Sequence, residues 1–179
     1  MSQRYFEIRK ELKDFAMKQE IFFVATASRG GRVNISPKGM DTLRILGSNQ
    51  VIWLNLTGSG NETSAHVQEN GIMTLMFCAF EGKPMILRFY GKAKVIHPKD
   101  AEWPGLIQLF PKIAGSRQIF DLSIDLVQRS CGMGVPFFDF VADRRDLKEV
   151  AEKKGEEGIR KYWKKKNAFS LDGKSTNIV

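Results

Sequence analysis

The residues with the clearest chemical potential lie in one short polar stretch at positions 56–63, LTGSGNET. After Leu56 it holds two glycines and four side chains with a hydroxyl or an amide. Glycine lets backbone N–H groups approach a ligand closely, and Ser, Thr and Asn can cap a helix or bind an anion. A helix that begins here would present N–H groups without intrahelical partners, which favours an anion. The alternative is a strand–loop–helix junction that binds nothing.

Two cations could supply charge to such a site. Lys38 follows a strand-like segment and precedes Gly39, so its side chain could reach an anion near the polar loop. Arg88 lies within an apolar run, where a buried guanidinium would need an anionic or hydrogen-bonding partner. Each has an alternative: Lys38 can be a solvent-facing turn residue, and Arg88 can point outward or pair with an internal carboxylate.

Other chemistries find little support. The polar loop lacks the Gly-Lys-Ser/Thr ending of a P-loop and the glycine spacing of a dinucleotide fingerprint. His66 and His97 have no Cys or carboxylate at metal-ligand spacing, so we expect no metal site. Cys78 and Cys131 do not indicate a disulfide framework, which suggests reduced thiols and a cytoplasmic protein. No side chain stands out as a catalytic acid or base.

The overall charge suits an anionic partner, because the 179 residues carry a net charge of +8. Much of the excess lies at residues 161–166, at the end of a predicted helix whose earlier part, 144–160, also contains several acidic residues. This mixture of signs is more typical of a solvated helix than of a nucleic-acid-binding stripe. No apolar run is long enough to cross a membrane, and the N-terminus has no apolar signal-peptide core.

The elements that must position these residues form one predicted domain over 1–179, with an N-terminal helix in 1–20, a barrel over 21–130 and a loop, helix and tail over 131–179. The hydrophobic patterns predict six strands, at 21–27, 32–36, 51–56, 72–80, 85–96 and 118–127, and a short extended piece at 42–46. Helices are expected at 3–19, 62–69, 97–110 and 143–166, with a bulge at Gly91 and an interruption at Gly155 or Gly158. This pattern implies an α+β fold, mainly β with peripheral helices, whose antiparallel sheet closes as a barrel.

Four segments, FVATA at 23–27, VNISPKG at 33–39, LTGSGNET at 56–63 and LMFCAFEG at 75–82, together resemble the pyridoxamine 5'-phosphate oxidase-like flavoprotein family. The segments SCGMGVP at 130–136 and KKN at 165–167 are similar to motifs of its uncharacterised bacterial-type members. That closer resemblance covers nearly the whole chain, whereas the match to the true oxidase covers about 20–97. It implies a six-stranded split β-barrel that binds FMN at the interface of a homodimer.

The resemblance also implies a cofactor site. Backbone groups around 34–36 and 54–57 would flank the ring, while Lys38 and the polar loop would hold the phosphate. The expected FMN-binding set is Asn34, Ile35, Ser36, Lys38, Leu56, Thr57, Ser59, Gly60, Asn61, Thr63 and Arg88. The true oxidase has an Arg where this chain has Val33 or Asn34, and a Ser-Arg-Lys run where it has Glu62-Thr63-Ser64. Hydroxyls, N–H groups, Lys38 and Arg88 would have to replace those cations.

The function that this resemblance implies is FMN binding, with flavin-dependent oxidation or reduction of a small molecule. Oxidation of pyridoxine phosphate is not expected, because the oxidase's C-terminal substrate-binding Arg and His pattern is absent. Two alternatives belong to other classes. The barrel could bind flavin, deazaflavin or haem without turnover, as a sensor does, or it could be a small basic nucleic-acid-binding barrel.

Overall fold

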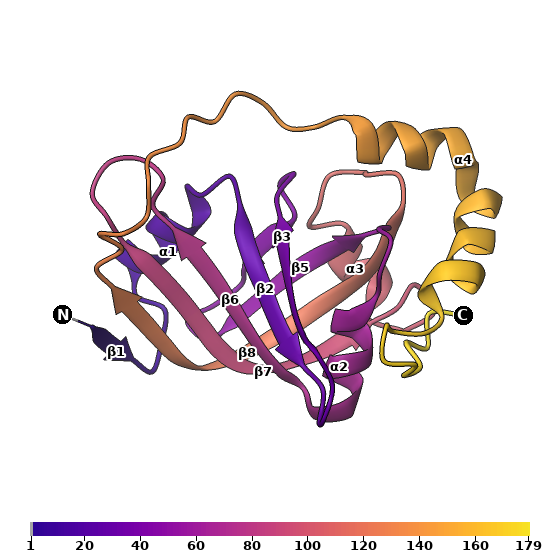
Figure 1. The fold of residues 1–179 in the computed structure, drawn as a ribbon, viewed down its shortest axis with the longest axis horizontal. Coiled ribbons are helices and arrows are strands. Elements are labelled where there is room, and N and C mark those ends of the chain that lie inside the picture. Colours follow the sequence, from indigo (N-terminus) through magenta and orange to yellow (C-terminus); the bar gives the residue numbers. More distant parts are fainter. Residues whose placement is uncertain (1) are drawn as a thin grey trace.

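One antiparallel sheet organises the chain in the computed structural model, which describes residues 2–179 (Figure 1). The strands are β1 Gln3–Tyr5, β2 Phe22–Ala27, β3 Val33–Lys38, β4 Leu43–Ile45, β5 Gln50–Leu56, β6 Ile72–Cys78, β7 Ile86–Ile96 and β8 Ser116–Ser130. Seven follow the order β3-β2-β6-β7-β8-β5-β4, and β1 pairs with β8. The sheet curls into the predicted α+β split barrel, with eight strands rather than six.

The helices lie around this sheet. They are α1 Lys10–Met17, α2 Glu62–Asn70, α3 Trp103–Ile107 and α4 Asp146–Tyr162, which continues as a π-helical turn, Trp163–Asn167. Residues 131–145 run along one end of the barrel to α4, which stands at its side (Figure 1). Gly155 interrupts α4 at φ 62°, ψ 174°, as predicted. No helix among residues 2–179 has the length and apolar character needed to cross a bilayer.

Alternation along the strands creates the core. In β2, Phe22 and Val24 point inward beside Leu75 of β6 and Phe89 of β7, and this cluster includes Trp53 of β5. The opposite side of β5 is also covered, because Ile52 and Leu54 and other apolar residues pack beneath α3. A strand buried on both sides reads as a continuous apolar run, which explains the sequence of β5.

Several predicted boundaries are wrong, each for a physical reason. Residues 3–5 form a strand rather than the start of a helix, because β8 extends beyond β5 and offers its free edge to β1. Only 103–107 of the predicted helix at 97–110 is helical, in a segment that carries prolines at 98 and 104. β3 continues through Pro37, which is tolerated because β3 is an edge strand. The bulge at Gly91 is confirmed by the register shift between β7 and β8.

The last dozen residues are not a solvated tail. Asn167, Ser170, Thr176 and Ile178 are buried, and Ser64 of α2 donates a hydrogen bond to the Thr176 carbonyl oxygen at 2.9 Å. Polar sequence alone suggested a tail, but these polar groups satisfy one another and α2 instead of water. The C-terminal segment is therefore part of the wall around the polar loop.

Candidate functional site

The polar loop joins β5 to α2. The carbonyl oxygens of Gly58, Ser59 and Gly60 accept hydrogen bonds from other side chains of the protein. The Asn167 amide nitrogen donates to the carbonyl oxygens of Gly58 at 3.1 Å and Ser59 at 3.4 Å. Arg117 Nη1 donates to the carbonyl oxygen of Gly60 at 2.9 Å. By contrast, the first N–H groups of α2 follow a cap residue, Asn61, whose side chain makes no capping hydrogen bond. The helix start therefore keeps the free donors that favour an anion.

The edge strand β3 lies beside this helix start. Its alternation turns Asn34, Ser36 and Lys38 toward the barrel interior. The Asn34 amide nitrogen donates to Thr63 Oγ1 at 3.2 Å, which ties the strand to the first turn of α2. Lys38 Nζ lies 5.4 Å from the centre of the Trp53 ring. Ser36, Lys38 and the polar loop therefore belong to one region of the structure.

Lys38 is a partly buried cation. None of the ion pairs within residues 2–179 includes it. Burial and, to a smaller extent, the positive charge of Arg117 together lower the pKa of its ammonium group from 10.5 to about 8. Lys38 and Arg117 carry charges of the same sign close together, so their repulsion costs folding free energy unless an anion binds near them.

Arg117 is a site residue that sequence reasoning missed. It has no partner across β5, because the pairing passes from Asn55–Gln118 to Leu56–Ser116. Such a bulge redirects a side chain, and here the guanidinium reaches the polar loop. Arg117 is 3% exposed, and burial lowers its pKa to about 10. The only feature of the sequence that could have identified Arg117 is its position directly before the alternating run at 118–127.

Unsatisfied polar atoms gather in this region. Eight buried side-chain nitrogen or oxygen atoms of the described chain have no hydrogen-bond partner. Five of them belong to three strands (β3, β5 and β8), the polar loop and the C-terminal segment: Ser36 Oγ, Trp53 Nε1, Asn61 Oδ1, Arg117 Nε and Asn167 Oδ1. Each such atom costs about 1–3 kcal/mol unless something pairs with it. Their concentration fits a site that a polar ligand completes.

The structure does not bring together all the predicted residues. Ile35 and Arg88 point to the other side of the sheet, and Arg88 Nη1 is 3.5 Å from Ser130 Oγ of β8. Leu56 packs with the apolar cluster beneath α3. The Thr57 hydroxyl is already used, because it donates to the Gly115 carbonyl oxygen at 2.7 Å and accepts from Trp163 Nε1 at 2.8 Å. Of the predicted residues, Asn34 contacts Thr63, and Ser36 and Lys38 lie on the same face of β3 as Asn34. Arg117 joins them to the loop of Ser59, Gly60 and Asn61, because it binds the Gly60 carbonyl oxygen and its charge acts on Lys38.

Glu62 would oppose an anion at the start of α2 if its carboxylate faced the loop. One of its oxygens instead accepts a hydrogen bond from the backbone N–H of Leu171 at 2.7 Å. The other oxygen stays beside the loop, since a Cβ on Gly60 would lie 2.8 Å from it, and the carboxylate charge acts on Arg117. Two cations, Lys38 and Arg117, therefore outnumber the Glu62 carboxylate near the polar loop.

Lys38 gives a prediction for stability against pH. Its pKa is about 8 in the folded protein and 10.5 for a free lysine side chain, so between these values the unfolded chain binds more protons. Unfolding free energy should therefore rise as pH increases from 8 to 10.5, by up to about 1.4 kcal/mol per pH unit. Urea titrations of ligand-free wild type and Lys38→Met test this. The difference between the two should shrink as pH rises, and a constant difference would contradict a partly buried, charged Lys38.

The fold and site together define a class: a split barrel with cations and unpaired polar atoms beside a helix start. The family model described as Pyridoxamine 5'-phosphate oxidase matches residues 8–131, and the chain belongs to this family. The Pyridoxamine 5'-phosphate oxidase family protein ustO of Aspergillus flavus is 38% identical over 144 residues, which are 78% of this chain and 58% of that protein. The chain thus spans less than two thirds of that relative's length.

Solved structures share the fold at lower identity. HupZ of Group A Streptococcus superposes with a TM-score of 0.54 at 21% identity, over 66% of this chain and 91% of that one. A putative pyridoxamine 5'-phosphate oxidase from Lactobacillus delbrueckii superposes with a TM-score of 0.53 at 17% identity, over 69% and 94%. These similarities concern the arrangement of the barrel.

Proposed function

We propose that the protein binds FMN, with the phosphate on Lys38, Arg117 and the N–H groups at the start of α2. The observation that carries this proposal is a pair of cations, Arg117 buried and Lys38 partly buried, beside unpaired polar atoms. A phosphate dianion would offset the repulsion between the two cations and pair with Arg117 Nε. Arg117 would thereby take the place of the cations that the true oxidase carries in β3 and at the start of α2.

Other residues of the region would orient the cofactor. Ser36 Oγ and Trp53 Nε1 are buried without partners, so each can hydrogen-bond to a polar group of a bound ring or ribityl chain. Bound FMN supplies hydride or single-electron chemistry, which would make the protein a flavin-dependent oxidoreductase of a small-molecule substrate. The role of the chain is to bind the flavin, orient it and limit the access of water.

A second subunit is part of this proposal. β3 is an edge strand whose outward residues Val33 and Ile35 are 68% and 65% exposed. Exposed apolar edges favour pairing or covering by another chain. A homodimer that covers this edge would bring a partner surface close to the strand that carries Lys38, as the proposed interfacial cofactor requires.

The direct test is the absorbance spectrum of the purified protein, followed by titration of the ligand-free protein with FMN and with riboflavin. Riboflavin is the matched control, since it has the same ring and lacks the phosphate. One charge-assisted hydrogen bond contributes about 1.5–3 kcal/mol, so we expect FMN to bind at least about tenfold more tightly. A colourless protein that fails to bind FMN at low salt would refute the proposal, and a bound haem spectrum would favour the haem alternative.

A further inference from the structure

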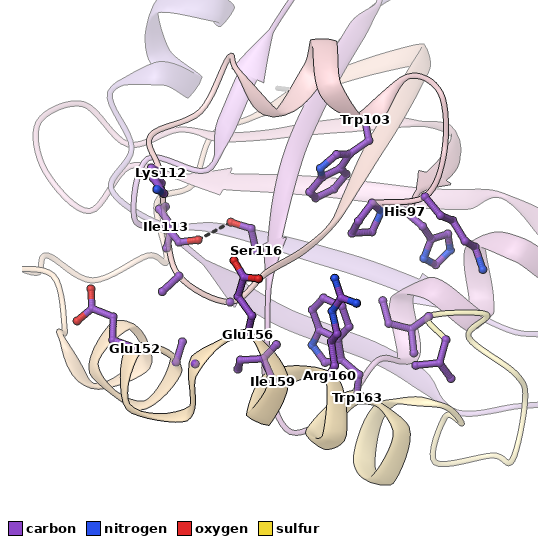
Figure 2. A pocket seen from close by; sticks show the side chains of 18 of the residues that line it. His97, Trp103, Lys112, Ile113, Ser116, Glu152, Glu156, Ile159, Arg160 and Trp163 are labelled. Atoms are coloured by element: carbon purple, nitrogen blue, oxygen red, sulfur yellow. Dashed lines mark hydrogen bonds between the residues drawn. The ribbon is translucent and has the colours of Figure 1, made fainter.

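A second cavity lies away from the proposed FMN site, between α4 and the segment that connects β7 to β8. Its volume is about 1070 Å³. In Figure 2, Trp103 and His97 line it from the barrel side, and Arg160 and Trp163 of the C-terminal helices face them. Ile113 and Ile159 add apolar surface. Its size is slightly above the range of about 300–1,000 Å³ that is typical of small-molecule pockets.

The way α4 is held explains why space remains beneath it. Of its 17 residues, only Ala151 and Ile159 are buried. At one end, Ala151 packs so closely on Gly115 that a Cβ at position 115 would lie 3.0 Å from the Ala151 Cβ. Beyond the other end, Trp163 is tied to Thr57 by a 2.8 Å hydrogen bond. The helix is therefore fixed at two points and, with its break at Gly155, spans the cavity between them.

The charges around the cavity favour an anion. Its lining includes five cationic side chains, Lys99, Lys112, Lys148, Arg160 and Lys164, but only two acidic ones, Glu152 and Glu156. Lys148 pairs with Glu152 at 3.9 Å. None of the ion pairs of the described chain involves Lys112, Arg160 or Lys164. These three cations are available to a ligand.

His97 provides an independent indication of a ligand. It is 5% exposed, and both of its ring nitrogens are buried without a hydrogen-bond partner. The residue lines the cavity. A histidine with two unsatisfied nitrogens is costly, and one donor and one acceptor would satisfy its neutral form. A molecule in the cavity that carries a polar group at this end would supply them.

We propose that this cavity binds a planar aromatic molecule with a negatively charged substituent. The ring would contact Trp103 and Trp163, the charge would lie near Arg160 and Lys112, and a polar group would meet His97. Indoles offer flat apolar faces, and a guanidinium binds carboxylate or phosphate through paired donors. This inference goes beyond the proposed function, because none of these residues holds the FMN phosphate.

The probe for this site is 8-anilinonaphthalene-1-sulfonate, which is aromatic, anionic and fluorescent when bound. We expect saturable binding at one site per chain of the full-length protein. Displacement should be at least about tenfold better with 1-naphthoate than with neutral 1-naphthalenemethanol, the gain of one charge-assisted contact. Equal displacement by the two competitors would mean that the cavity selects only apolar character, which would overturn the proposal, as would the absence of saturable binding.

Two variants locate the site. Arg160→Gln should weaken 1-naphthoate binding about tenfold, while leaving the neutral competitor unchanged. Lys153→Gln is the matched control: it removes one positive charge from the same helix, at an exposed position outside the lining. An equal loss in both variants would indicate long-range attraction instead of a site. Both should retain wild-type FMN binding, so that failure here is distinguishable from failure of the FMN proposal.

Discussion

Replacement of Lys38 and Arg117 by methionine is expected to remove the preference for FMN over riboflavin. Each single substitution deletes one charge-assisted contact with the phosphate and should weaken FMN binding by about 10–100-fold, or about 1.5–3 kcal/mol. Riboflavin binding should change little, since it makes no phosphate contact. Fluorescence titration of both ligands with wild type, the two single variants and the double variant measures the effect.

The Lys38→Met variant separates binding from folding. It removes a partly buried cation that has no carboxylate partner and that is repelled by Arg117, so the ligand-free protein should become more stable while FMN binding weakens. Arg117→Met leaves the Gly60 carbonyl oxygen without its donor, so this variant should lose stability as well. If both ligands weakened equally in Lys38→Met, the lysine would serve the shape of the pocket instead of the phosphate.

The second large effect is expected for Gly91→Ala in β7. A Cβ at this position would lie 1.9 Å from the carbonyl oxygen of Ser123 and 3.0 Å from Ile124 Cα in β8. Both obstacles are backbone in the longest strand pair, at the bulge, so neither can move without breaking the ladder. We expect a loss of about 3 kcal/mol or more in unfolding free energy, measured by urea denaturation.

Gly47→Ala is the control for that substitution. Gly47 lies in a turn, and a Cβ there would meet no atom within 4 Å. Its substitution should change stability by no more than about 0.5 kcal/mol. Similar stabilities for the two variants would mean that the β7–β8 contact at Gly91 adapts to a methyl group, which would contradict the close approach seen at the bulge.

The sequence predicted the barrel well because the apolar pattern of each strand reflects which of its sides are buried. The alternation in β2 and the apolar run of β5 both follow from which sides are covered. β1 left no such signal: its three residues form a strand only because the edge of β8 is free. The same limit applies to the C-terminal segment, whose polar residues find partners in α2.

The candidate site was predictable to the extent that its residues are neighbours in sequence. Lys38 and the polar loop were identified because each stands beside glycine at the end of a strand. Arg117 was not, because its direction depends on a bulge that involves the pairing of two distant strands. Arg88 was predicted to take part, but strand alternation left its side undetermined, and it faces away from Lys38.

The contacts of Asn167 with the polar loop have a consequence for the order of assembly. The Asn167 side chain contacts residues 108 and 109 positions earlier in the chain, and Trp163 contacts Thr57 across 106 positions. During synthesis, the loop therefore emerges long before the groups that bind its carbonyls, and closing so long a loop is slow. The barrel can form first, and the cofactor site becomes complete only after the C-terminal segment has docked.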